Sequence, residues 1–86
     1  MNLTFTPSAW DDYLWFEQND RKLLKRINQL IHDILRTPFD GVGKPEPLKG
    51  SLAGCWSRRI NDEHRLVYKV KTDNVIIIAC RYHYGN

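Results

Sequence analysis

The apolar residues between positions 23 and 35 constrain the fold of this chain more than any other feature, because they recur at intervals of three and four. They are Leu23, Leu24, Ile27, Leu30, Ile31, Ile34 and Leu35. This spacing places them on one face of an α-helix, and Asn19 or Asp20 can cap its start. Thr37-Pro38 ends the pattern, because a proline disfavours the helical conformation in the residue before it. The sequence therefore predicts a helix of about four turns with one buried face.

The segment before this helix predicts two further elements. Residues 3–6, "LTFT", are a short strand candidate, and Pro7 with Ser8 as an expected N-cap opens a first helix. The segment after it, residues 39–50, is rich in glycine and proline and has no apolar period. It is therefore expected to be a loop that connects the helices to the rest of the chain.

Three apolar segments follow this loop, at residues 55–60, 65–71 and 75–82, and turn-forming residues separate them. This arrangement is typical of an antiparallel meander. The predicted fold class is α+β: an N-terminal strand, two helices, then a three-stranded antiparallel meander forming one sheet packed on the helices. A chain of 86 residues is expected to be one domain, 1–86, because it is too short to hold two hydrophobic cores.

Composition indicates a soluble protein, with 42% hydrophobic and 27% charged residues. The sequence has no apolar run of about 18 residues and no signal peptide, so we expect no membrane association and a cytoplasmic location. Cys55 and Cys80 lack the spacing of metal ligands and are expected to be reduced, buried thiols.

Basic residues are concentrated in the second half of the chain. Residues 1–43 carry five Lys and Arg against six Asp and Glu, whereas residues 44–86 carry eight against four. Such asymmetry favours a polyanionic partner, nucleic acid first, although ordinary surfaces also carry a net excess of this size.

The predicted sheet brings two arginines together. Side chains alternate along a strand, so Leu66 and its inward neighbours leave Arg65 on the other face. A three-residue turn at 61–63 then places Arg59 opposite Arg65. Such a pair suits a phosphodiester. In the last strand Arg81 and His83 share a parity and could join the same face.

Glu46 is held between Pro45 and Pro47, which restrict the backbone on both sides. If the loop folds over the sheet, Glu46, Arg65 and His83 supply a base, a cation and an acid. This set fits RNA cleavage by the RNA's own 2′-hydroxyl without a metal ion. The alternative is that Glu46 is a solvated loop residue. His83 alone is equally weak evidence for a catalytic site.

Several segments resemble the Txe/YoeB family of bacterial toxins, within the RelE-like superfamily of ribosome-dependent mRNA endoribonucleases. The resemblance spans nearly the whole chain and is carried by "GKPEPLK", "WSRRI", "EHRLVY" and "RYHY", in the family's order and spacing. It implies a RelE-like fold, cleavage of mRNA in the ribosomal A site, and no metal or organic cofactor.

The resemblance also implies roles for individual residues. Glu46 matches the general base, His83 the general acid, Arg65 the transition-state stabiliser and Tyr84 an aromatic residue that orients the substrate. Supporting basic positions match Lys49 and Arg59, which with Arg81 form the expected RNA-binding and phosphate-binding set.

The family further implies partners: an antitoxin of the YefM/Phd type, the ribosome and its mRNA, and in some members a second copy of the toxin. A different function class stays open, a non-catalytic, antitoxin-bound binding module or transcriptional corepressor. The presence of Glu46, Arg65 and His83 together favours the enzyme, because a pure binding protein needs no acid and base at these positions.

Overall fold

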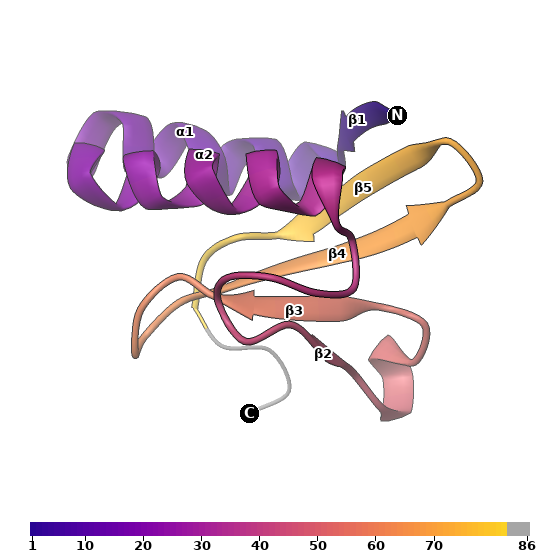
Figure 1. Ribbon diagram of the computed structural model, residues 1–86. Coiled ribbons are helices and arrows are strands. Elements are labelled where there is room, and N and C mark those ends of the chain that lie inside the picture. The colour runs from indigo at the N-terminus through magenta and orange to yellow at the C-terminus, as the bar shows by residue number, and fades with distance from the viewer. Residues whose placement is uncertain (83–86) are drawn as a thin grey trace.

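The computed structural model describes residues 1–82, in which two helices cover one face of a five-stranded sheet (Figure 1). The helices are α1 (Pro7–Asn19) and α2 (Arg21–Arg36), and η1 (Gly50–Leu52) is a short 3-10 helix. The strands are β1 (Asn2–Phe5), β2 (Glu46–Pro47), β3 (Trp56–Arg59), β4 (Arg65–Lys71) and β5 (Asn74–Ala79). Their order in the sheet is β1-β5-β4-β3-β2. The predicted α+β class is confirmed.

Side-chain caps define the start of both helices. The Thr6 hydroxyl accepts a hydrogen bond from Ala9 N at 3.1 Å, and Pro7 occupies the first helical position. Thr6 therefore caps α1, and the expectation that Ser8 does so was wrong. The Asp20 carboxylate caps α2 by accepting from Leu23 N at 3.1 Å, as one of the two predicted residues.

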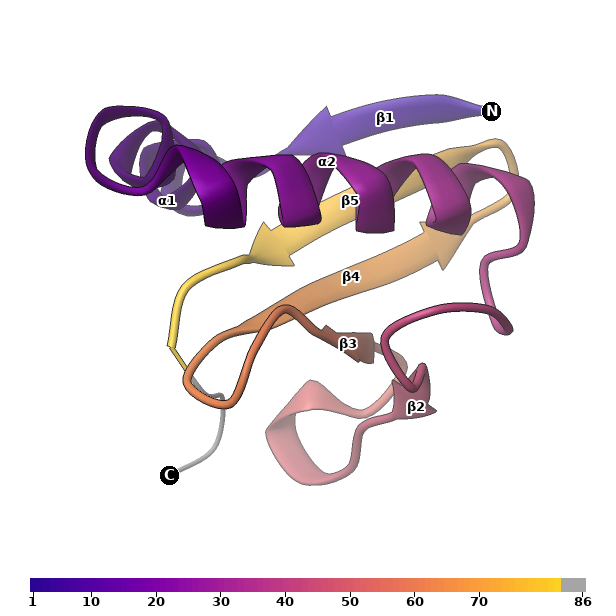
Figure 2. The same ribbon diagram turned by 60° about the vertical axis from the view of Figure 1, so that its left-hand side comes forward.

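The main core lies between the helices and the sheet. Helix α2 crosses over β4 and β5 (Figure 2) and buries the face that its apolar period predicted. The two helices and the strands β4 and β5 contribute its fully buried side chains, among them Phe16, Ile27, Leu30, Ile34, Leu66, Tyr68 and Ile77. Burial of this apolar set is the main stabilising contribution to the fold.

The last strand lies in the interior of the sheet. β5 pairs in parallel with β1, with Leu3 opposite Val75, and antiparallel with β4 on its other side. β5 therefore connects the N-terminal strand β1 to the rest of the sheet. The N-terminal strand that the sequence predicted forms an edge of the same sheet as the meander.

The segment predicted to be a loop, residues 39–50, contains an additional strand. Within it β2 pairs with β3, with Glu46 opposite Ser57 and Pro47 opposite Trp56, and η1 begins at Gly50. A proline fits an edge strand because its missing N–H can face away from the sheet. Two residues are too few to produce a readable apolar alternation.

A β-bulge interrupts the pairing of β4 and β5. Val67 pairs with Ala79, but the next residue, Tyr68, pairs with Ile77, which leaves Ile78 as an extra residue in β5. The bulge reverses the alternation of β5. Cys80 is therefore buried in the main core, and the strand ends at Ala79 rather than at the predicted position 82.

A smaller apolar cluster covers part of the other face of the sheet. It consists of Leu48, Cys55 and Val67, with Leu52, Ile78 and Ala79 packed against it. Leu48 and Leu52 come from the segment around η1, so this segment lies over the sheet. Beside the cluster, the same face carries the polar side chains described below.

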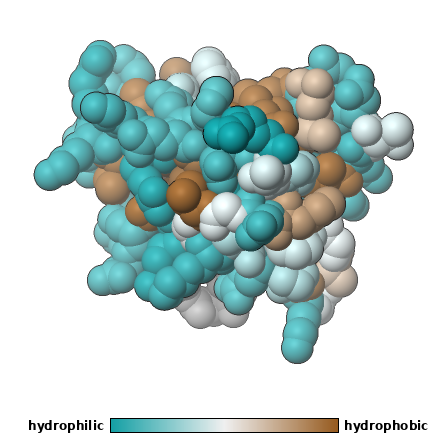
Figure 3. All heavy atoms as spheres, in the orientation of Figure 1, coloured by the Kyte–Doolittle hydropathy of each residue, from teal (hydrophilic) through white to brown (hydrophobic). Residues whose placement is uncertain are grey.

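Hydrophilic atoms cover most of the face seen in Figure 3, and hydrophobic atoms show there as small separate patches. Among residues 1–82, no helix is long and apolar enough to cross a membrane.

Candidate active site

The turn between β3 and β4 brings the two predicted arginines together. Arg59 pairs with Arg65 across the strands, as the alternation predicted. The Asn61 side chain organises the turn, because its Oδ1 accepts from Glu63 N at 2.9 Å and from His64 N at 2.7 Å. An asparagine that binds the backbone two and three residues later is a common way to stabilise such a turn.

The guanidinium of Arg65 is held by the same turn. Its Nη1 donates to Asn61 O at 2.6 Å and to His64 O at 3.0 Å, and the residue is only 9% exposed. Both acceptors are backbone carbonyls, which orient the guanidinium without neutralising its positive charge. A fixed charge of this kind can stabilise an anion that develops beside it.

Arg59 has a more open environment. Its side chain is 45% exposed, and its Nη1 lies 3.8 Å from Asp62 Oδ1, which is itself on the surface. Exposed pairs at this distance are strongly screened by water. The Arg59 backbone is fixed, because its N–H donates to Gly43 O at 2.7 Å and its carbonyl accepts from Arg26 Nη2 at 3.3 Å.

Glu46 shares this face of the sheet. It pairs with Ser57 of β3, two residues before Arg59, and side chains two residues apart on a strand point to the same side. Strands lie about 4.8 Å apart and rise about 3.3 Å per residue, so the Cα atoms of Glu46 and Arg65 are roughly 12 Å apart. Two long side chains starting at this separation can both reach a phosphate placed between them.

Lys49, the other predicted basic position, follows β2 and precedes η1. Its side chain is exposed, and its carbonyl accepts a hydrogen bond from Leu52 N at 3.3 Å. The ammonium group lies at the solvent edge of the segment that carries Glu46.

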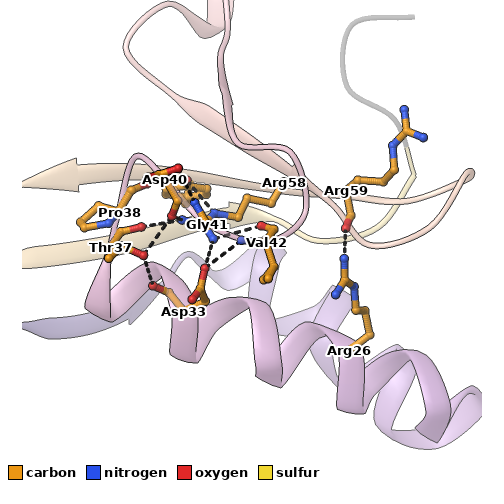
Figure 4. A network of polar contacts seen from close by, with 10 residues as sticks. Arg26, Asp33, Thr37, Pro38, Asp40, Gly41, Val42, Arg58 and Arg59 are labelled. Carbon is orange, nitrogen blue, oxygen red and sulfur yellow. Dashed lines mark hydrogen bonds and ion pairs between the residues drawn. The ribbon is translucent and has the colours of Figure 1, made fainter.

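A fully buried arginine, which the sequence did not single out, holds the segment leading to Glu46. Within residues 1–82 the Arg58 guanidinium donates five hydrogen bonds, and it is 0% exposed (Figure 4). The acceptors are Asp33 Oδ2, Tyr68 Oη and the carbonyl oxygens of Thr37, Asp40 and Val42. The hydrogen bond from Arg58 and a second from Val42 N lower the pKa of the Asp33 carboxyl.

Close packing at Gly41 and Gly43 fixes the path of this segment. Gly41 has a φ of 119°, and a Cβ there would lie 2.1 Å from Asp33 Oδ2. Gly43 has a φ of 84° and its carbonyl binds Arg59 N. Arg58 thus ties the end of α2 to β3, and the chain enters β2 in a set register.

The described chain ends beside Arg65. Arg65 N donates to Tyr82 O at 3.1 Å, and Tyr82 N donates to His64 Nδ1 at 2.7 Å. Tyr82 has a φ of 63°, in the left-handed region. His64 is 3% exposed, and burial lowers its pKa.

Arg81, predicted to bind phosphate, lies between two aromatic rings. Its guanidinium carbon is 3.8 Å from the centre of the Trp15 ring and 4.7 Å from that of Tyr82, and its Nη2 donates to Tyr82 Oη at 2.9 Å. These contacts are typical of a cation–π arrangement. The Arg81 guanidinium therefore packs against α1 through Trp15.

Two of the predicted site residues, His83 and Tyr84, lie outside the described residues. Among the others, the structure pairs Arg59 with Arg65, places Glu46 on their face and brings residue 82 to Arg65. Within residues 1–82, no group of three or more His, Cys, Asp or Glu side chains is arranged to hold a metal ion.

Comparison with known proteins places this arrangement in a family. A family model described as the YoeB-like toxin of bacterial type II toxin-antitoxin systems matches residues 5–84. The chain belongs to this family. A curated relative, "Toxin YoeB" of Synechocystis sp., is 64% identical to this YoeB-like chain over 84 residues, which is 98% of each protein. "Toxin YoeB" of Escherichia coli is 57% identical over 98% of this chain and 100% of its own.

Solved structures of other YoeB-like proteins superpose closely. A YoeB/ParE toxin from Agrobacterium tumefaciens has a TM-score of 0.95 at 51% identity, covering 98% of this chain and 100% of that one. The toxin of a heterotetrameric YoeB-YefM complex from Staphylococcus aureus has a TM-score of 0.89 at 52% identity, and a YoeB dimer from the same organism 0.91 at 52%, each covering 98% of both chains. The H87Q mutant of YafQ from Escherichia coli shares the fold alone, with a TM-score of 0.83 at 15% identity over 98% of both chains.

Proposed function

We propose that this YoeB-like toxin is a ribosome-dependent endoribonuclease that cleaves mRNA in the A site and so inhibits translation. The observation that carries the proposal is the common face of Glu46, Arg59 and Arg65, with the backbone of Tyr82 hydrogen-bonded to that of Arg65. His83 and Tyr84 follow Tyr82 directly in the sequence. A base, two cations and an acid are thereby available to one phosphodiester.

The reaction is an attack of the RNA's own 2′-hydroxyl on the adjacent phosphorus. Glu46 takes the hydroxyl proton as the O2′–P bond forms, and His83 gives a proton to the 5′ oxygen as the P–O5′ bond breaks. Arg65 stabilises the additional negative charge on the pentacoordinate phosphate. Tyr84 orients the substrate.

Binding and chemistry use different basic residues in this proposal. Arg59 and Lys49 are exposed and contact the RNA backbone, as does Arg81 to the extent that its stacked guanidinium can reach a phosphate. The protein groups supply the proton transfers and the charge stabilisation, so the reaction requires no metal or organic cofactor. The substrate is ribosome-bound mRNA, so the toxin acts in the cytoplasm.

An antitoxin of the YefM type is the proposed protein partner. The YoeB-YefM complex from Staphylococcus aureus, whose toxin is 52% identical to this chain, supports this assignment. An acidic, partly disordered antitoxin segment would cover the basic face and gain from charge complementarity as it orders. The toxin dimer from the same organism supports self-association as well.

Induced expression without an antitoxin tests the function. We expect growth arrest with loss of mRNA, and normal growth when Glu46→Gln or His83→Gln is expressed. Glu17→Gln, which changes an exposed carboxylate on α1, is the matched control and should remain toxic. Unimpaired growth with the unaltered protein would indicate the alternative, a non-catalytic binding module or corepressor.

The ends of the products test the chemistry. Attack by the 2′-hydroxyl leaves a 2′,3′-cyclic phosphate, or the 3′-phosphate from its opening, on the upstream fragment and a 5′-hydroxyl on the downstream one. A 5′-phosphate with a free 3′-hydroxyl would mean that water attacked the phosphorus, and the role of Glu46 as base would be wrong.

A further inference from the structure

Two consecutive residues at the start of β4 hold the backbone of Tyr82. His64 Nδ1 accepts from Tyr82 N at 2.7 Å, and Arg65 N donates to Tyr82 O at 3.1 Å. The Tyr82 side chain, in contrast, is 52% exposed. The Tyr82 ring also contacts the His64 ring, with the centres 5.4 Å apart, and its hydroxyl accepts from Arg81 Nη2. The backbone hydrogen bonds and these ring contacts together set the position of Tyr82.

These two hydrogen bonds fix a backbone conformation that tyrosine rarely adopts. Tyr82 has a φ of 63°, and residues with a side chain occupy this region only where the surroundings impose it. Without the bond to His64, an extended conformation becomes more favourable at this residue.

The imidazole of His64 is itself fixed. Its ring packs edge-on against Phe16 of α1, with the ring centres 5.1 Å apart, and its backbone N–H donates to Asn61 Oδ1 at 2.7 Å. An Nδ1 that accepts a hydrogen bond requires the ring proton on Nε2, which lies 3.5 Å from Glu63 Oε1. One neutral tautomer satisfies both sides of the ring.

We propose that His64 is a positioning residue for the catalytic acid, a role that rests on the proposed function. Its neutral imidazole holds Tyr82, the residue directly before His83 in the sequence, in the left-handed conformation. His64 does not touch the RNA and transfers no proton. It acts through the backbone of Tyr82.

Protonation of His64 would release the turn. A second proton would occupy Nδ1 and face the N–H of Tyr82, so two donors would oppose each other. Glu63, Asp20 and Asp12 favour the protonated ring, whereas burial and Arg81 oppose it, and burial is the largest of these effects. The neutral, accepting form is therefore the one that the fold maintains.

Two substitutions separate the acceptor from the packing. In His64→Asn the amide oxygen can take the place of Nδ1, since both atoms are bonded to Cγ. In His64→Phe the ring and its contact with Phe16 remain, but the acceptor is lost. The measurements are amide hydrogen exchange at Tyr82 by NMR, and ribosome binding and single-turnover cleavage on programmed ribosomes.

We expect exchange at Tyr82 to be about three to ten times faster in His64→Phe, the factor that one net hydrogen bond contributes. Cleavage by this variant should fall on the order of 100-fold, as for a displaced catalytic group, with ribosome affinity unchanged. His64→Asn should resemble the unaltered protein in every measurement. Equal cleavage by His64→Phe and the unaltered protein, or equal impairment of both variants, would overturn the inference.

The unaltered protein decides the remaining cases. If His64→Phe does not fold, the same NMR spectra of the unaltered protein must show the Tyr82 amide losing protection as the His64 ring is protonated, and constant protection would overturn the inference. Failure of the unaltered protein to cleave mRNA would instead contradict the proposed function. Cleavage that is insensitive to His64→Phe contradicts only the role of His64.

Discussion

Arg59 and Arg65 lie directly opposite each other on one face of the β3–β4 pair, yet their guanidinium groups have different environments. Arg65 is nearly buried and held by two carbonyls of its own turn, whereas the Arg59 side chain is about half exposed. A fixed, buried charge suits stabilisation of a transition state, and a mobile, exposed one suits attraction of a phosphate backbone.

Replacement of Arg59 by alanine should weaken RNA binding and reduce the slope of log affinity against log salt concentration by about one. Replacement of Arg65 by alanine should mainly slow cleavage. Binding measured at several salt concentrations, together with single-turnover rates, checks both statements. Equal effects of the two substitutions on binding and on cleavage would contradict this division of roles.

The Glu46→Gln variant should cleave mRNA on the order of 100-fold to 10,000-fold more slowly, the usual contribution of a positioned base. A carboxylate acts as a base only when ionised, so the rate of the unaltered protein should fall in acid, and this fall should be absent in the variant. His83→Gln should remove the corresponding fall in alkali. Single-turnover rates over a range of pH, with ribosome affinity as the control, test this assignment.

The Arg58→Met variant should lose about 1.5–3 kcal/mol of unfolding free energy, because Asp33 and the carbonyls of Thr37, Asp40 and Val42 lose their shared charged donor. Unfolding in denaturant measures the change. The matched control is Arg21→Met, which removes an exposed arginine paired with Glu17 on the helix surface and should change stability by no more than about 0.5 kcal/mol. Similar losses in both variants would show that the buried network is not a main support of the fold.

The same network predicts how stability depends on acid. The hydrogen bond from Arg58 holds the pKa of Asp33 below its ordinary value. The ionised carboxylate therefore stabilises the folded protein above the pKa of an unfolded aspartate, and this contribution is lost as the pH falls through the lower, folded pKa. In Arg58→Met this part of the acid sensitivity should disappear, and a pH series of unfolding measurements can detect the difference.

Relative to His64→Asn, the unaltered protein should lose stability as the pH falls below about 6.5, the ordinary histidine value. Burial lowers the pKa of His64 in the folded protein, so the unfolded chain takes up the proton first and is favoured by acid. The two proteins share every other titrating group, so the difference between their unfolding free energies isolates His64. A constant difference across this range would contradict the prediction.

Cys80 should not react with alkylating reagents while the protein is folded. Burial raises the pKa of its thiol to about 12, and its side chain is fully buried, so the reactive thiolate is scarce and inaccessible. Peptide mapping after brief exposure to iodoacetamide measures labelling at each cysteine, and unfolded protein serves as the control. Rapid labelling of Cys80 in the folded protein would show that the end of β5 opens readily.

Sequence patterns predicted the structural features that depend on residues close together in the chain. The period of α2, its cap at Asp20 and the pairing of Arg59 with Arg65 follow from helical spacing, side-chain chemistry and strand alternation. The sequence did not single out Arg58 of the same strand, because a charged residue at an inward position indicates nothing until its partners are known. Those partners lie on α2 and the loop after it.

The features that the sequence did not reveal depend on contacts between distant segments. β2 is too short to show a pattern and exists through its pairing with β3. The bulge at Ile78, which buries Cys80, is a property of the pairing with β4 and not of β5 alone. The hydrogen bond from Tyr82 N to His64 Nδ1 likewise joins residues that are 18 positions apart.

The place of β5 between β1 and β4 has a consequence for how the toxin is made. β5 follows every other described element along the chain, so until it has been synthesised β1 and β4 lack the strand that joins them and the helices lack Val75 and Ile77 to pack against. The sheet is completed by pairing between residues 72 positions apart in the chain, Asn2 and Asn74, and contacts at such long range form slowly during folding.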